Sequence, residues 1–81
     1  MKLVYTLQFK KNFRNFPRQT QKKFGKQAKY LITDLRHPSL HAKKYDEKRH
    51  IWQARVDRDI RFYFIIESES YILLAIQHHP K

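Results

Sequence analysis

Two arginines and a histidine in the second half of the sequence have the chemistry to act together on a phosphate group. Arg55 and Arg61 stand on either side of a short polar stretch, and His79 lies near the end of the chain. A guanidinium binds phosphate oxygens through paired, charge-assisted hydrogen bonds. An imidazole can accept or donate a proton near neutral pH, because its unperturbed pKa is about 6.5. The three residues predict an anion site if the fold brings them together.

Three strands are predicted to carry these side chains, over residues 51–56, 60–67 and 71–77. Apolar residues alternate along each of them, and the polar stretches 57–59 and 68–70 read as turns between them. Alternate residues of a strand point to opposite faces of the sheet. The apolar face is expected to form the core, with Trp52, Ala54, Val56, Ile60, Phe62, Phe64, Ile66, Ile72, Leu74 and Ile76.

The lengths of the two turns predict which residues are cross-strand neighbours. A three-residue first turn pairs Arg55 with Arg61, and a three-residue second turn over 68–70 sets Arg61 opposite Gln77, with His79 diagonally close. Like charges placed opposite one another are destabilising. Unless an aspartate of the first turn neutralises the arginines, the pairing predicts an anion site at one end of the face opposite the core.

The first half of the sequence predicts one strand and two helices. Apolar residues alternate over 2–8 and then take helical spacing, first in a short helix over 9–16 and then in a basic amphipathic helix over 17–36. Residues 37–50 are expected to form a long polar loop. The order β-α-α-β-β-β predicts a single α+β domain over 1–81, a twisted antiparallel sheet of four strands with both helices packed on one face.

The charge of the chain predicts a polyanionic partner. Eighteen Lys+Arg against seven Asp+Glu give a formal net charge of +11, which favours nucleic acid over an anionic membrane surface or an acidic protein. No cysteine is present, and the adjacent His78 and His79 face opposite sides of a strand, so neither a metal site nor a cofactor is expected. With no apolar run of about 18 residues and no secretory signal pattern, a cytoplasmic protein is expected.

Three segments resemble the RelE/ParE superfamily of bacterial toxins. They read His37-Pro38-x-Leu40-x-x-Lys43-Lys44, Ile51-Trp52-x-x-Arg55-Val56-x-x-Asp59-x-Arg61 and Leu73-Leu74-x-Ile76-x-x-His79. The resemblance implies the toxin of a type II toxin–antitoxin system, inhibited by an antitoxin encoded in a neighbouring gene. In the RelE branch it implies a ribosome-dependent endonuclease that cleaves mRNA in the A site. The implied partners are the antitoxin, the 70S ribosome with its RNA, and mRNA.

The same resemblance implies roles for individual residues. Arg61 matches the arginine that contacts the scissile phosphate, His79 falls where several members have a catalytic histidine, and Arg55 takes a basic position on the preceding strand. Those three are the expected catalytic residues. The expected RNA-binding residues are Lys43, Lys44, Gln53, Tyr63 and Lys81.

The sequence departs from the superfamily pattern in two places. Where some members have a glutamate as base, it reads Leu40-His41-Ala42, and the tyrosine that follows the histidine in many members is absent. Tyr63 or Tyr71 is then left as a stacking residue.

RNA cleavage at such a site requires no metal, since the 2′-hydroxyl is the nucleophile. His79 would transfer a proton, the two arginines would bind the non-bridging oxygens, and Lys44 or Lys81 would stabilise the leaving oxygen. An acidic antitoxin segment is expected to cover this face.

Other interpretations remain open on the sequence alone. The fold suits a ParE-like inhibitor of DNA gyrase, which does not need the clustered arginines and histidine. It also suits a non-catalytic RNA-binding protein or a decayed toxin. The arginines could equally be solvated residues paired with Asp57, Asp59 or Glu67, and the histidine could belong to a frayed tail.

Overall fold

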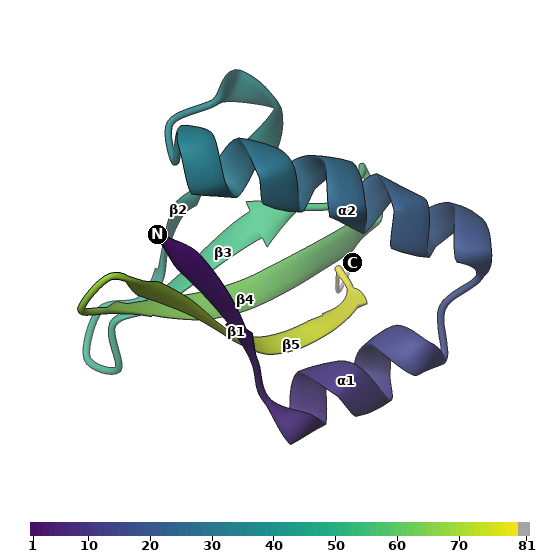
Figure 1. Cartoon of the computed structure of the whole chain (residues 1–81), viewed down its shortest axis with the longest axis horizontal. Helices are drawn as coiled ribbons and strands as arrows, with labels where there is room; N and C mark the ends of the chain where they lie inside the picture. The colour runs from purple at the N-terminus through teal and green to yellow at the C-terminus, as the bar shows by residue number, and fades with distance from the viewer. Residues whose placement is uncertain (80–81) are drawn as a thin grey trace.

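The chain folds as an α+β domain in a computed structural model that describes residues 1–79. The fold class is as predicted, with both helices on one side of a single sheet (Figure 1). The elements in chain order are β1 (Lys2–Tyr5), α1 (Leu7–Arg14), α2 (Arg18–Thr33), the 3₁₀ turn η1 (Pro38–Leu40), β2 (Lys43–Asp46), β3 (Ile51–Arg55), β4 (Ile60–Glu67) and β5 (Ser70–His78).

The sheet has five strands, so the prediction of four was wrong. Its order is β1-β5-β4-β3-β2. The fifth strand, β2, lies within the stretch expected to be a loop and pairs antiparallel with β3. Its sequence, Lys-Lys-Tyr-Asp, lacks the apolar alternation that identifies a strand, although charged side chains suit an edge strand because they discourage pairing with another chain. At the other edge β1 runs parallel to β5, so the sheet is mixed rather than antiparallel.

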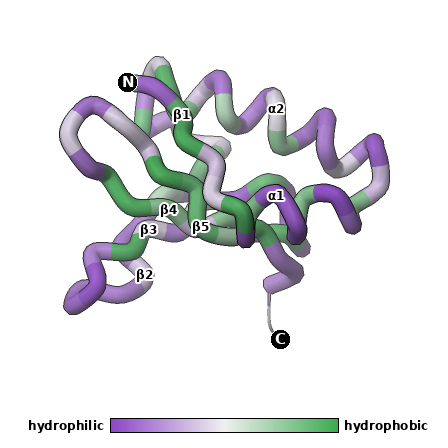
Figure 2. The backbone as a smooth tube through the Cα atoms, turned by 60° about the horizontal axis from the view of Figure 1, so that its bottom comes forward, coloured by the Kyte–Doolittle hydropathy of each residue, from purple (hydrophilic) through white to green (hydrophobic). Residues whose placement is uncertain are grey.

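Both helices pack through aromatic rings on the same face of the sheet. The ring of Phe24 on α2 lies 5.2 Å from that of Phe9 on α1 and 5.2 Å from that of Phe62 on β4. The side chain of Thr6 starts α1 by accepting a hydrogen bond from the backbone N–H of Phe9 and ties it to the sheet by donating to the carbonyl of Leu73. Figure 2 shows the hydrophobic colour following β4 and β5, which the helices cover.

The last strand does not keep one alternation throughout, and part of the predicted core was therefore wrong. Tyr71 and Leu73 are buried in the core in place of Ile72 and Leu74. The pairing changes between Tyr63, opposite Ala75, and the next residue of β4, opposite Leu73, so that Leu74 forms a bulge. Ile66, also expected in the core, is exposed. The other predicted core residues lie as expected, with Trp52 partly buried against the core.

The turn before β5 also differs from the prediction. It contains two residues rather than three, with Glu67 opposite Ser70, and the positive φ of 55° at Ser68 makes the tight turn possible. The short turn shifts the register by one residue and the bulge at Leu74 shifts it back. Arg61 consequently lies opposite Gln77, as predicted.

Within residues 1–79, no helix has the length and apolar character needed to cross a bilayer.

Candidate active site

Arg55 and Arg61 are paired across β3 and β4, as the turn length predicted. The turn closes through the backbone N–H of Val56, which donates to the carbonyl of Ile60 at 2.9 Å. The side chain of Arg61 is nearly buried, at 6% exposure, and that of Arg55 is partly exposed. Two positive charges are therefore neighbours on the face that the helices leave uncovered.

The guanidinium of Arg61 is held in place by backbone carbonyls. Its Nη1 donates to the carbonyls of Asp57 at 2.7 Å, Arg58 at 3.0 Å and Ile60 at 3.2 Å. All three acceptors are neutral and all three bonds use the same nitrogen. The carbonyls therefore fix the orientation of the guanidinium without neutralising its charge, and Nε and Nη2 make no hydrogen bond to residues 1–79.

The nearest aspartate serves the turn and not the arginines. Asp57 accepts hydrogen bonds from the backbone N–H groups of Asp59 at 2.8 Å and Ile60 at 2.9 Å, and it pairs with Lys23 of α2 at 3.4 Å. Burial alone would raise the pKa of Asp57, but the two N–H groups and the Lys23 ammonium outweigh it and leave the pKa below its usual value. No ion pair of either arginine is found in the part of the chain that the structure describes. The interpretation of the arginines as members of surface salt bridges is therefore not supported.

The arginine pair opens into a hollow of about 350 Å³ on the uncovered face of the sheet. It brings together five of the predicted site residues and two more from the segment before β2. The lining residues are His41, Ala42, Lys43, Gln53, Arg55, Arg61 and His79. We refer to it as the arginine hollow.

His79 is attached to the turn that also holds Arg61. Its backbone N–H donates to the carbonyl of Asp59 at 2.7 Å, while its imidazole is exposed and lines the arginine hollow. Its neighbour His78 lies on the other side of β5, where its ring is 5.2 Å from that of Phe16. The hydrogen bond to the turn argues against a frayed end at this position.

Tyr63 lies on the same face but is covered. Only 6% of it is exposed, its hydroxyl accepts a hydrogen bond from Nε2 of Gln53 at 3.2 Å, and the ring of Tyr45 lies 5.0 Å away. Tyr45 is 59% exposed. The aromatic surface available for stacking here is thus that of Tyr45, which the sequence reasoning missed because its strand was read as a loop.

The other predicted RNA contacts lie elsewhere. Lys44 is directly opposite Trp52 on the helix side of the sheet, so it does not reach the arginine hollow. Tyr71 is in the core, with its ring against Phe64, and burial raises its pKa. Lys81 lies outside the described residues.

His41 is the residue of the arginine hollow that sequence reasoning missed. It ends η1 in the left-handed conformation, with φ of 47°, and lines the same hollow as His79. The signal was present in the comparison with the superfamily pattern, because the stretch Leu40-His41-Ala42 stands where some members have a glutamate base. An imidazole can perform the same proton transfer.

A buried glutamine positions this segment. Gln27 of α2 is 6% exposed, and its Nε2 donates to the carbonyls of Ser39 at 3.1 Å and Arg55 at 2.9 Å. Its Oε1 accepts from the hydroxyl of Ser39 at 3.0 Å. One side chain therefore joins α2, η1 and β3, and it sets the distance between His41, two residues after Ser39, and Arg55.

The geometry combines phosphate-binding groups with groups that transfer protons. Two arginines and Lys43 supply positive charge, and His41 and His79 supply two imidazoles in one open hollow. Fixed positive groups are most effective where negative charge develops during a reaction. The hollow therefore has the groups needed for acid–base chemistry at a phosphodiester.

The fold is similar to that of solved toxin structures. The YoeB/ParE toxin from Agrobacterium tumefaciens has a TM-score of 0.82 over 99% of this chain and 100% of that chain, at 14% identity. The heterotetrameric YoeB-YefM toxin–antitoxin complex from Staphylococcus aureus gives 0.79 over 96% and 95%, at 11% identity. The RelB-RelE antitoxin–toxin complex from Methanococcus jannaschii gives 0.74 over 93% and 88%, at 13% identity. No protein-family model and no curated protein sequence matches the chain.

Proposed function

We propose that this chain, which has the RelE/ParE-like toxin fold, is the toxin of a type II toxin–antitoxin system and cleaves mRNA in the A site of the ribosome. The observation that carries the proposal is the arginine hollow, where two arginines without a carboxylate partner in residues 1–79 line the same hollow as two histidines. A fold alone does not determine function. The proposal therefore depends on these side chains.

The cleavage step uses the nucleophile that RNA itself carries. One imidazole, of His41 or His79, takes the proton of the 2′-hydroxyl, and the 2′-oxygen attacks the adjacent phosphorus. The bond from phosphorus to the 5′-oxygen breaks, and the other imidazole gives that oxygen a proton. The products are a 2′,3′-cyclic phosphate and a 5′-hydroxyl. Each positioned proton-transfer group commonly contributes ~10² to 10⁴ in rate.

The arginines stabilise the phosphorane-like transition state. The phosphate oxygens gain negative charge as the 2′-oxygen attacks, and the N–H groups of Arg61 that are not bonded to the turn, with those of Arg55, are the donors for them. Because three carbonyls already fix the Arg61 guanidinium, little reorganisation is needed during the reaction. Removing one donor of this kind costs ~10² to 10³ in rate.

The partners follow from the same surface. The net charge of +11 suits binding to ribosomal RNA and mRNA. Cleavage of mRNA on the ribosome would take place in the cytoplasm. Two of the three structural neighbours named above are described as complexes of a toxin with an antitoxin, YefM or RelB. We assign this protein an acidic antitoxin segment that covers Arg55, Arg61 and His79, so that the same charges bind either the inhibitor or the substrate.

Inhibition of DNA gyrase is the second candidate function, because one structural neighbour is described as a YoeB/ParE toxin. A translation reaction distinguishes the two functions. The purified protein is added to message with and without ribosomes, and in parallel to a DNA supercoiling assay. Cuts at ribosome-occupied codons with intact supercoiling support the proposal. Loss of supercoiling with uncut message overturns it in favour of gyrase inhibition, and no effect in either assay overturns both candidates.

A further inference from the structure

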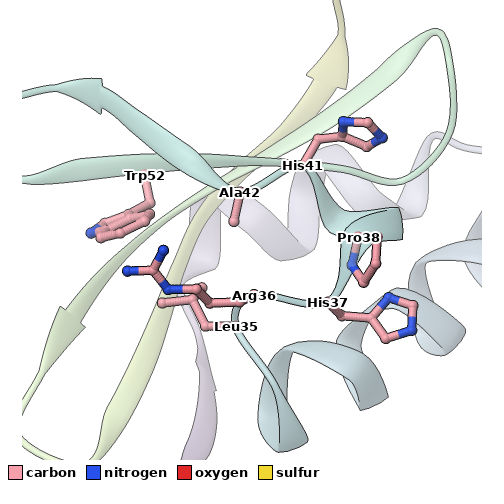
Figure 3. Close-up of a pocket in the computed structure, with 7 residues that line it drawn as sticks. All are labelled: Leu35, Arg36, His37, Pro38, His41, Ala42 and Trp52. Atoms are coloured by element: carbon pink, nitrogen blue, oxygen red, sulfur yellow. The ribbon is translucent and has the colours of Figure 1, made fainter.

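A second hollow adjoins the arginine hollow. It has a volume of about 220 Å³ and lies between the end of α2 and β3 (Figure 3). Its lining residues are Leu35, Arg36, His37, Pro38, His41, Ala42 and Trp52. His41 and Ala42 line both hollows, so the two hollows adjoin at this two-residue segment.

The two hollows lie on opposite sides of the sheet edge. Gln53 and Arg55 of β3 line the first, whereas Trp52, the residue between them in alternation, lines the second. Adjacent residues of a strand point to opposite faces. An RNA strand that occupies both hollows would therefore pass around the start of β2, over His41.

The lining of the second hollow combines a flat aromatic ring with positive charge. Trp52 is the only tryptophan of the protein, and the Nζ of Lys44 lies 5.6 Å from its ring centroid. In Figure 3 the side chain of Arg36 extends toward the indole, with Ala42 to the right of the indole and His41 on the far side of Ala42. Unstacked bases of RNA bind to aromatic rings and to arginine planes in this manner.

The charges around the tryptophan are not neutralised within residues 1–79 by a close partner. Arg36 makes no ion pair there, and the only carboxylate near Lys44 is that of Glu47, at 3.9 Å and 80% exposed. Asp34 accepts from the backbone N–H of Arg36, at 3.0 Å, rather than from its guanidinium. An exposed pair at 3.9 Å contributes little. The Arg36 guanidinium is therefore available to a nucleotide, whereas the Lys44 ammonium already lies over the Trp52 ring and must share it with a stacked base.

We propose that the second hollow binds the base of a nucleotide next to the cleaved bond, by stacking against Trp52 and Arg36. The proposal rests on the function assigned above, in which the scissile phosphate lies at Arg55 and Arg61. His41 and Ala42, which line both hollows, connect base binding to cleavage. A base bound in the second hollow keeps the reacting nucleotide beside the imidazole of His41. Stacking tolerates every base because each has a flat π face, so this subsite gives affinity and alignment rather than strict base identity.

The single tryptophan provides a direct test. Trp52 fluorescence is followed while the protein is titrated with an RNA trinucleotide that carries 2′-O-methyl groups and cannot be cleaved. The titration is repeated with three trinucleotides that each have one abasic position. We expect the complete trinucleotide to quench Trp52 and one abasic position to abolish the quench. That position should also weaken binding by roughly 5- to 150-fold, the range for loss of one stacked base.

Two matched variants show whether Arg36 takes part. Arg36→Gln should weaken binding of the complete trinucleotide more than Arg18→Gln does, and should weaken binding of the critical abasic one no more than Arg18→Gln does. Arg18→Gln removes the same charge from an exposed position at the start of α2, so it measures the loss due to charge alone. Equal effects of the two substitutions would overturn the subsite.

The outcomes also separate this subsite from the proposed function. Cleavage of translated mRNA without any quench of Trp52 up to millimolar trinucleotide overturns the subsite and leaves the nuclease. A quench that one abasic position abolishes, together with uncut mRNA, supports the base subsite and overturns the nuclease.

Discussion

Arg55 on β3 and Arg61 on β4 are direct cross-strand partners, and within residues 1–79 no carboxylate pairs with either of them. Like charges in this arrangement destabilise a sheet. The carbonyls that hold the Arg61 guanidinium offset part of the cost, and Asp57, which could have neutralised the pair, is instead bonded to the turn and to Lys23. The fold thus keeps two adjacent positive charges at the expense of stability, as expected if they form the proposed anion site.

That cost should be measurable by removing one charge. Arg55→Gln is expected to raise the free energy of unfolding at low ionic strength by about 0.2 to 1 kcal/mol, since it relieves the cross-strand repulsion. The gain should shrink in high salt, which screens the charges. Urea unfolding at two salt concentrations measures it. Arg58→Gln, in the exposed turn, is the control, and an equal gain for both variants would show that the pairing is not the cause.

His41 should be as important for cleavage as His79. His41→Asn is expected to lower the cleavage rate by ~10² to 10⁴, because it removes a proton-transfer group. Asparagine tolerates positive φ, so the backbone at 47° is retained. His50→Asn is a matched control, since His50 is also exposed and has φ of 57°. Single-turnover cleavage rates are measured from pH 5 to pH 9. The plot of rate against pH should lose one of its two sloping limbs in the His41 variant and keep both in the His50 variant. If both variants cleave like the parent protein, His41 has no proton-transfer role.

Gln27 should support both stability and activity. Gln27→Leu leaves the carbonyls of Ser39 and Arg55 without their donor, and the expected cost is about 1 to 3 kcal/mol in the free energy of unfolding. Urea denaturation measures this, with Gln19→Leu at an exposed position of the same helix as control. Because Gln27 joins η1 to β3, cleavage should also fall under conditions where the variant is fully folded. Full activity of the folded variant would mean that the arginine hollow does not need the hydrogen bonds of Gln27 to Ser39 and Arg55.

Asp57 should make the protein sensitive to acid. Its pKa is lower in the folded protein than in the unfolded chain, so its carboxylate contributes stability above the unfolded pKa of about 4. That contribution is lost as the pH falls toward the folded pKa. Asp57→Asn keeps an acceptor for the turn but does not titrate, and its unfolding free energy should decline less between pH 5 and pH 2. Parallel declines in the two proteins would contradict a role for this carboxylate.

The arginine pair was predictable from sequence because it depends on local features. Strong alternation defined β3 and β4, and the polar residues of one short turn fixed their register. The opposite pairing of Arg61 and Gln77 was also predicted, but through two errors that cancel, a turn one residue too long and a bulge not foreseen at Leu74. A bulge depends on how the sheet packs and twists, which alternation does not encode.

The segment before β3 was not predictable for a different reason. Lys43, Lys44 and Asp46 form a strand through backbone pairing at an edge, with no apolar pattern to reveal it. His41 enters the site because η1 ends in a left-handed residue and because Gln27, distant in sequence, holds the turn against β3. Neither contact follows from local spacing.

The most direct test of the central claim is mRNA cleavage by the intact protein, Arg61→Ala and Arg58→Ala in a reconstituted translation system, read by primer extension with analysis of the RNA ends. The account predicts cuts at ribosome-occupied codons with 2′,3′-cyclic phosphate and 5′-hydroxyl ends. Arg61→Ala should reduce them ~10²-fold or more, and Arg58→Ala should leave them near the parent level. Uncut message with the intact protein, or equal cutting by the Arg61 variant, would contradict the assignment of the arginine hollow as a ribonuclease site.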